Sequence, residues 1–268
     1  MKINNVKIFI TFLLTSYFLL LISYLFSQQE NVPLDHQVYI FLKEMKVKNL
    51  PVNIHDDNPN MSRAEIRKNL ERIDSLSNEL STTENKLLKK FQNEFYDDLA
   101  DSTNTYQFFG DQAGFSKKGS DFLSDKIKYV YAYRGEGANY FLNVMGRIMY
   151  GQNFKPYINN SWLYDIGFRF RGTLFEKLGY SLTVQKGGVS GSQDFAPTLD
   201  PRLKYNFKYV ENIENISNYD FTEGYLRYYT EPVKDMSLAF QIGREKIKFG
   251  YGYESKLVLS GDHPLLDF

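Results

Sequence analysis

Charged side chains recur at alternate positions in several segments after residue 140, and their types suit the recognition of acidic or hydroxyl-rich ligands. Guanidinium groups bind carboxylates through two parallel hydrogen bonds, and carboxylates accept hydrogen bonds from hydroxyls. Two of the acidic residues could act as the acid and base of a glycosidase, but pairing with a neighbouring Arg169 or Arg227 is the simpler expectation. The candidate binding residues are Arg147, Asp165, Arg169, Arg171, Glu223, Arg227 and Arg244.

Motifs for other chemistry are weak. The three histidines, His36, His55 and His263, do not have the spacing of a metal motif. Gly250-Tyr251-Gly252 lacks the third glycine of a dinucleotide fingerprint. The absence of cysteine excludes disulfides, thiolate metal sites and cysteine nucleophiles. We therefore expect a non-enzymatic protein without a cofactor or a bound metal.

The candidate residues lie in segments whose hydrophobic period is two, which is typical of β-strands. In residues 162–171, Trp162, Tyr164, Ile166, Phe168 and Phe170 alternate with polar residues or glycine. The same alternation occurs in residues 127–134, 140–150, 180–185, 223–228 and 236–242. For residues 127–134 we expect one strand with Ile127, Tyr129, Tyr131 and Tyr133 on one face.

A transmembrane β-barrel explains these segments better than a soluble β-sandwich, which remains the alternative. The segments are about ten residues long, as a tilted strand that crosses a bilayer requires. Tyr and Phe gather at their ends, and mid-strand charges suit a watery lumen. We expect the candidate binding residues to point inward and pair with one another. The residues expected to face lipid are Leu142, Val144, Ile166, Phe168, Leu182, Leu226, Leu238 and Phe240.

The predicted strands are too few for a closed barrel. Six or seven strands occur by Ile247, whereas a membrane barrel needs about eight or more. We therefore expect residues 101–268 to be the first part of a longer barrel. Residues 176–177 and 231–235 are predicted as tight turns. Residues 187–205 and 210–218 are predicted as external loops, with a strand extension over 204–209.

Residues 32–100 have a helical period instead. Ser62-Arg63-Ala64-Glu65 and Ser81-Thr82-Thr83-Glu84 are predicted capping boxes, in which the serine and the glutamate bond each other's backbone N–H. With a preceding helix that ends before Pro51, they predict a three-helix bundle. Its apolar stripes are Val38, Phe41, Leu42 and Met45; Ile66, Leu70, Ile73 and Leu80; and Leu88, Phe91, Phe95 and Leu99.

The N-terminus is typical of an export signal. Lys2 and Lys7 precede an apolar run over residues 8–26, after which the chain becomes polar. Cleavage after Ser27 is expected, although the run could also remain as an uncleaved anchor. The predicted organisation is α+β: a signal peptide (1–27), a periplasmic helical domain (28–100) and a partial antiparallel outer-membrane β-barrel (101–268).

Three short segments resemble a known family. They are similar to segments of Wzi-type capsule-assembly proteins. The first combines Val32-Pro33-Leu34-Asp35-His36 with Met61-Ser62-Arg63-Ala64-Glu65-Ile66, the second is residues 243–252 (GREKIKFGYG), and the third combines Leu257-Val258-Leu259-Ser260 with Pro264. The resemblance implies an outer-membrane barrel that helps to assemble or attach capsular or exported polysaccharide.

Residues 62–65 also resemble a surface-layer-homology repeat, which binds cell-wall polymers. The alternative is therefore a general porin anchored to the cell wall through residues 32–100. The expected partners are polysaccharide and outer-membrane lipid. A net charge of zero gives no electrostatic reason to expect nucleic acid.

Overall fold

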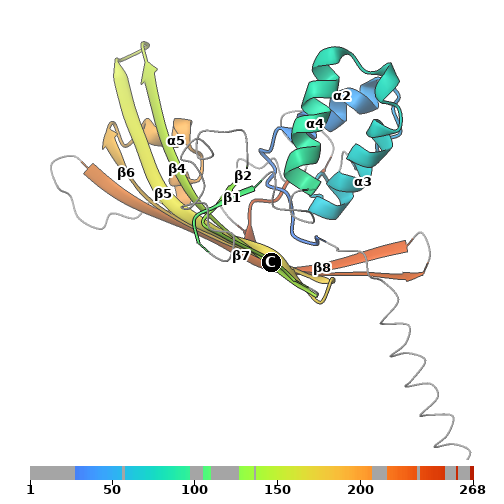
Figure 1. The fold of residues 1–268 in the computed structure, drawn as a ribbon. Helices are drawn as coiled ribbons and strands as arrows, with labels where there is room; N and C mark the ends of the chain where they lie inside the picture. The colour runs from blue at the N-terminus through green and yellow to red at the C-terminus, as the bar shows by residue number, and fades with distance from the viewer. Residues whose placement is uncertain are drawn as a thin grey trace, which may run out of the picture.

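The computed structural model describes residues 28–55, 58–96, 105–109, 127–135, 137–206, 216–233, 236–250, 258 and 266–268. A small helical bundle is followed by a long antiparallel sheet, so the expected α+β class is confirmed (Figure 1). The predicted signal segment, residues 1–27, lies outside the described residues.

The bundle forms around the apolar stripes predicted from the sequence. Their members are buried, apart from Leu99, which lies outside the described residues. Phe91 and Phe95 of one helix pack on the ring of His36, which precedes the first helix. The helices are α2 (Val38–Val47), α3 (Arg63–Asp74), the 3₁₀ turn η1 (Ser77–Glu79) and α4 (Thr82–Tyr96).

Both predicted capping boxes are confirmed. At the start of α3, the backbone N–H of Glu65 donates to Ser62 Oγ at 3.2 Å, and the N–H of Ser62 donates to Glu65 Oε2 at 2.6 Å. At the start of α4, the backbone N–H of Ser81 donates to Glu84 Oε2 at 2.8 Å. These bonds satisfy N–H groups that the helical hydrogen-bond ladder leaves open, and so fix where each helix begins.

The large sheet has seven strands in the order β3-β4-β5-β6-β7-β8-β9, and every neighbouring pair is antiparallel. Phe175 and Glu176 have positive φ in the tight turn between β5 and β6, as expected near residues 176–177. Among the described residues, the first and last strands of this sheet are not paired with each other. The strands are β3 (Tyr131–Gly135), β4 (Ala138–Asn153), β5 (Asn159–Leu174), β6 (Leu178–Gly191), β7 (Ile216–Val233), β8 (Met236–Glu245) and β9 (Leu266–Asp267).

The strand predicted over residues 127–134 is broken at Val130. Its first part, β2 (Ile127–Tyr129), pairs in parallel with β1 (Thr105–Gln107), and only the second part joins the large sheet. Tyr129 is consequently buried against Phe141, whereas Tyr131 and Tyr133 are exposed. The expectation of one continuous aromatic face was therefore wrong.

The predicted external loop over residues 187–205 is also shorter than expected. Strand β6 continues to Gly191, and two short helices follow, α5 (Ala196–Leu199) and α6 (Leu203–Asn206). Residues 204–206 are thus helical and do not extend a strand. Ala196 and Leu203 pack with Leu163, Val189, Tyr219 and Phe221, so this connection folds back onto the sheet.

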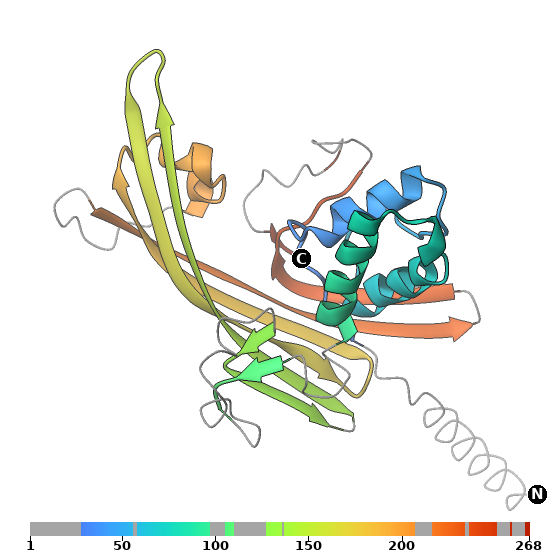
Figure 2. The same cartoon turned by 45° about the horizontal axis from the view of Figure 1, so that its top comes forward.

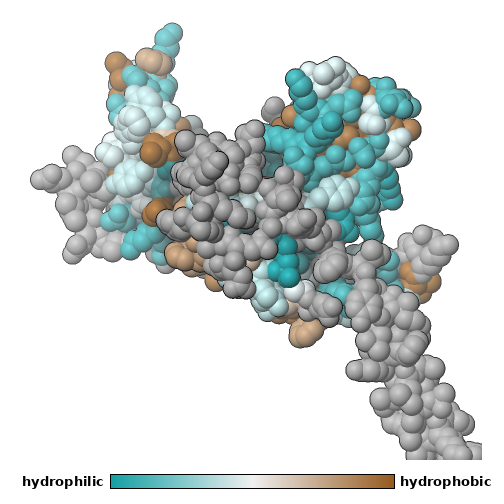
Figure 3. All heavy atoms as spheres, in the orientation of Figure 1, coloured by the Kyte–Doolittle hydropathy of each residue, from teal (hydrophilic) through white to brown (hydrophobic). Residues whose placement is uncertain are grey.

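The sheet is strongly bent, and the helices lie on its concave face (Figures 1 and 2). The bundle covers the end near β7 and β8, and α5 lies towards the opposite end. The bundle surface is mainly hydrophilic (Figure 3). No described helix is both long enough and apolar enough to span a membrane.

The convex face of the sheet is apolar. Leu142 is half-buried, but the other residues predicted to face lipid are exposed on this face. Phe240 and Val144, for example, are 63% and 62% exposed. The two-residue period therefore placed the apolar set correctly. The exposed members are Val144, Ile166, Phe168, Leu182, Leu226, Leu238 and Phe240.

Candidate functional site

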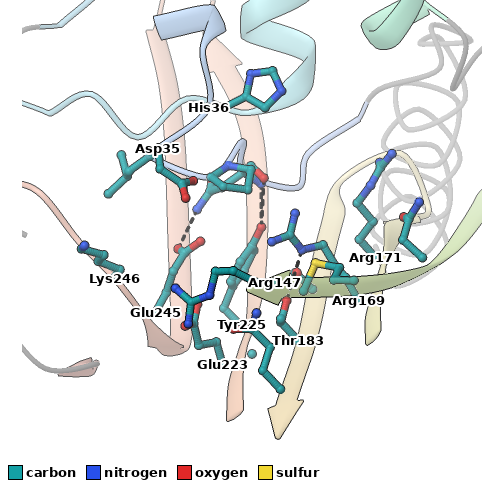
Figure 4. Close-up of a pocket in the computed structure, with 18 of the residues that line it drawn as sticks. Asp35, His36, Arg147, Arg169, Arg171, Thr183, Glu223, Tyr225, Glu245 and Lys246 are labelled. Atoms are coloured by element: carbon teal, nitrogen blue, oxygen red, sulfur yellow. Dashed lines mark hydrogen bonds between the residues drawn. The ribbon is translucent and has the colours of Figure 1, made fainter. Parts of the chain in front are cut away.

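A polar cavity of about 690 Å³ lies between the helical bundle and the concave face of the sheet (Figure 4). Its floor is formed by side chains of β4 to β8, and its roof by the segment before α2 together with Arg63 and Glu94. Residues 199–202, between α5 and α6, close another side. The volume falls in the range of small-molecule pockets, roughly 300–1,000 Å³.

Residues 28–31, which we call the N-terminal strap, are buried between the bundle and the sheet. Glu30 is fully buried and accepts hydrogen bonds from Arg171 Nη1 at 2.7 Å and Thr173 Oγ1 at 2.8 Å. Arg227 Nη1 donates to the carbonyl oxygen of Gln29 at 3.1 Å. Two arginines expected to serve a ligand therefore bind the chain itself.

The end of the strap forms one wall of the cavity. The backbone N–H of Asn31 donates to the Tyr225 hydroxyl at 2.7 Å, and its side-chain amide donates to Gln241 and Glu245 at 2.9 and 3.1 Å (Figure 4). Arg227 also lies 3.5 Å from Glu65 of α3. The strap and α3 thus join the bundle to β7 and β8 through buried and half-buried polar contacts.

Ion pairs fix the opposite side of the cavity. Arg147 on β4 donates to Asp165 on β5 at 2.8 Å and also contacts Asp200 at 2.8 Å. Arg202 contacts Asp200 at 2.9 Å and Glu223 on β7 at 3.0 Å. Burial raises the pKa of Asp200, but Arg202 and Arg147 outweigh it and bring that pKa to about 2. The segment after β6 is therefore tied to the sheet by charge.

Gly187 makes room for the hydrogen bond between Tyr219 and Asp165. Asp165, Gly187 and Tyr219 lie in register on β5, β6 and β7. Because glycine has no side chain, the Tyr219 ring can pass over Gly187, and its hydroxyl donates to Asp165 Oδ2 at 3.0 Å. A Cβ at Gly187 would overlap the carbonyl oxygen of Tyr164.

A polar row crosses the floor of the cavity from β4 to β7. Asn143, Arg169, Thr183 and Glu223 are successive cross-strand partners, and all four line the cavity. The row presents an amide, a guanidinium, a hydroxyl and a carboxylate. This combination can bind a hydroxyl-rich ligand that also carries negative charge.

His36 and Glu94 form a further polar contact at the roof. The His36 Nδ1 accepts a hydrogen bond from the backbone N–H of Val38, so Nε2 can donate to Glu94 at 2.9 Å. Burial raises the pKa of Glu94, but the hydrogen bond from His36 and nearby positive charges produce a net decrease.

The structure brings most of the predicted site residues together. Arg147, Arg169, Arg171 and Glu223 line the cavity. Asp165 and Arg227 lie on the same concave face but do not line the cavity. Asp165 is paired with Arg147, and Arg227 donates to the carbonyl oxygen of Gln29. Pairing within the predicted set is confirmed for Arg147 and Asp165. The narrower expectation that Asp165 and Glu223 pair with Arg169 or Arg227 was wrong, since their partners are Arg147 and Arg202.

Arg244 was also placed incorrectly. It is exposed, lies on the same convex face as Ile242 and pairs with Asp267 on β9. A strand side chain shares a face with the residue two positions away, so the alternation already required this placement. The expectation that Arg244 points inward was based on its charge and did not take account of its position two residues after Ile242 in the strand.

Several residues of the site were not foreseen. Asp200 and Arg202 carry a local signal, because the backbone N–H of Arg202 donates to Asp200 Oδ1 in an Asx-type turn before α6. Glu30, Asn31 and Glu245 have no comparable local pattern. Their role depends on contacts between segments far apart in the sequence.

The arrangement presents charged and hydrogen-bonding groups that can bind a polar ligand. Three of its carboxylates, Asp165, Asp200 and Glu223, pair with arginines, and Glu245 accepts hydrogen bonds from Asn31 and Gln241. No group of three or more His, Asp or Glu side chains could hold a metal ion in the described part of the chain. Comparisons with protein-family models, curated proteins and solved structures found no match to this chain.

Proposed function

We propose that this chain belongs to an outer-membrane protein that assembles capsular or exported polysaccharide or attaches it to the cell surface. The observation that carries the proposal is the two-faced sheet. One face is apolar and exposed, and the other is charged, concave and covered by a helical domain with a polar cavity between them.

The apolar face favours a lipid environment. Strands β4, β5 and β7 have 16, 16 and 18 residues, long enough for a tilted strand to cross a bilayer and project beyond it. Isoleucine and phenylalanine side chains exposed on the convex face would be unfavourable in water but favourable against hydrocarbon. Backbone groups at an open sheet edge cannot remain unpaired in lipid, so the proposal requires both edges of the sheet to be paired in the membrane.

The concave face favours a glycan as the ligand. Sugars are bound through hydrogen bonds to their hydroxyls, and acidic sugars also through arginine. Asn143, Arg169, Thr183 and Glu223 supply these groups in one row. The resemblance of residues 32–66 and 243–264 to Wzi-type proteins leads to the same proposal.

A porin anchored to the cell wall is the second candidate, because residues 62–65 resemble a surface-layer-homology motif. Here Ser62 and Glu65 form a capping box, and Arg63 is buried and donates to the carbonyl oxygen of Glu94 at 2.9 Å. These side chains are occupied within the protein, so the motif gives limited support to wall binding.

The proposal can be tested on the full-length protein in its native cell envelope. We expect it in the outer-membrane fraction, with heat-modifiable migration on gels. Deleting its gene should release surface polysaccharide into the medium without lowering total synthesis. Recovery from the soluble periplasm would contradict the barrel. Unchanged surface polysaccharide together with large conductance in planar bilayers would favour the porin.

A further inference from the structure

Arg169 differs from the other arginines that line the cavity. Arg147, Arg171 and Arg202 each contact a carboxylate at 2.9 Å or less, and Arg63 donates to the carbonyl oxygen of Glu94 at 2.9 Å. Within the described part of the chain, Arg169 makes one hydrogen bond, from its Nε to the Thr183 hydroxyl at 3.2 Å, and the carboxylates of Asp35 and Glu223 act on it without a direct ion pair. Its two terminal nitrogens are thus available to a ligand in the cavity (Figure 4).

The surroundings of Arg169 specify what kind of anion it can bind. The carboxylates of Asp35, Glu223 and Glu245 line the same cavity, as do the hydroxyls of Ser181 and Thr183. Phosphate could contact the guanidinium, but it has few protons to donate to these carboxylates. A sugar ring would instead donate its hydroxyls to them while its own charge stayed at the guanidinium.

We propose that the cavity is a binding site for a saccharide unit that carries a carboxylate, such as a hexuronate. This inference rests on the proposed function and adds the ligand class and the location of the site. The carboxylate lies in the fork of the Arg169 terminal nitrogens, and the ring hydroxyls bond Asn143, Thr183 and Glu223. The site lies between the bundle and the sheet, and residues 199–202 of the connection after β6 close one side of it.

The planar guanidinium fork explains the choice of carboxylate. Two parallel N–H groups match the two oxygens of a carboxylate, and such charge-assisted pairs are stronger than neutral hydrogen bonds. Lys246 and Lys248 also line the cavity and add positive charge without the same geometry. A neutral sugar would leave the half-buried Arg169 guanidinium without a direct charged partner, which is unfavourable.

Calorimetry on the detergent-purified full-length protein tests the proposal. The probes are a glucuronate tetrasaccharide, a glucose tetrasaccharide with the same linkage and inorganic phosphate. We expect the glucuronate probe to bind about tenfold or more tightly than the glucose probe, because the two differ only at the carboxylate. Arg169→Gln should remove this preference, and Arg169→Lys should retain part of it.

Arg244→Gln is the matched control, because Arg244 lies on the convex face and outside the cavity. Circular dichroism and heat-modifiable migration show whether each variant is folded. Equal binding of both tetrasaccharides, an unchanged preference in folded Arg169→Gln, or tighter binding of phosphate would each overturn the inference. Binding of neutral sugar alone would leave the proposed function in place, whereas recovery from the periplasm with no sugar binding would overturn both.

Discussion

Individual arginines on the concave face have two different roles. Arg171 and Arg227 hold the N-terminal strap, whereas the terminal nitrogens of Arg169 face the cavity. The difference depends on whether a carboxylate or carbonyl of the chain itself lies in reach. Residue type alone therefore does not separate the arginines that hold the strap from the one that we propose binds a ligand.

Removing Glu30 should strongly destabilise the protein. Glu30→Ala leaves the buried Arg171 guanidinium without its counter-ion, and such a loss costs about 3–5 kcal/mol. The midpoint of denaturant unfolding measures the change. Asp267→Asn, which removes the partner of the exposed Arg244, is the control and should leave the midpoint unchanged. Equal midpoints in both variants would show that the strap does not stabilise the fold.

The Asp200 contacts should fail in acid. The pKa of Asp200 is lowered from 3.8 to about 2 in the folded protein, so its stabilising effect is complete above pH 3.8 and is lost as pH falls through 2. Acid-stable pepsin should therefore cleave within residues 192–206 faster at pH 2 than at pH 4, relative to cleavage elsewhere. In Asp200→Asn this difference should disappear. A pH-independent cleavage ratio in the unmodified protein would contradict the assignment.

At the scale of elements, local sequence signals and structure agree at the helix starts. Ser62→Ala removes the side-chain acceptor for the N–H of Glu65 and should lower the free energy of unfolding by about 1 kcal/mol. Ser62→Thr keeps the acceptor and should change it much less. Thermal unfolding followed by circular dichroism compares the two. Equal losses would mean that the hydroxyl does not act as a cap.

Two strand glycines should respond oppositely to alanine. A Cβ at Gly187 overlaps backbone, whereas at Gly146 the nearest atom is 3.7 Å away. Gly187→Ala should therefore destabilise the protein by about 1–3 kcal/mol through overpacking. Gly146→Ala should be neutral or stabilise it by up to about 1 kcal/mol. Denaturant titration of the pair measures both, and a tolerated Gly187→Ala would argue against the Tyr219–Asp165 arrangement.

Local patterns predicted the strands and helices well because their physical causes are local. The two-residue period placed Phe168 and Arg169 on opposite faces, and the serine–glutamate spacing located the start of α3. Partners in the site could not be found this way. Arg171 and Glu30 are 141 residues apart, and Arg227 and Gln29 are 198 apart. No periodicity or motif encodes such pairs.

At the scale of the whole molecule, the barrel proposal depends on which medium contacts the convex face. Ile166→Arg places a charge on that face, which costs about 2–4 kcal/mol at the bilayer midplane. We expect Ile166→Arg to lower the amount of heat-modifiable protein in the outer membrane, whereas Ile166→Leu should leave that amount unchanged. Because Ile166 is 67% exposed, a protein whose convex face contacts water should tolerate both changes. Equal membrane levels would therefore contradict the proposal.

The strap also sets an order of events during synthesis. Residues 28–31 are made long before β5 and β7, whose side chains bind them. The bundle core is local and can form early, but Glu30 remains without its arginine until the sheet exists. Contacts of such long sequence separation form slowly. Attachment of the bundle to the sheet should therefore be a late step, so a sheet that pairs incorrectly would leave a folded but undocked bundle exposed to proteases.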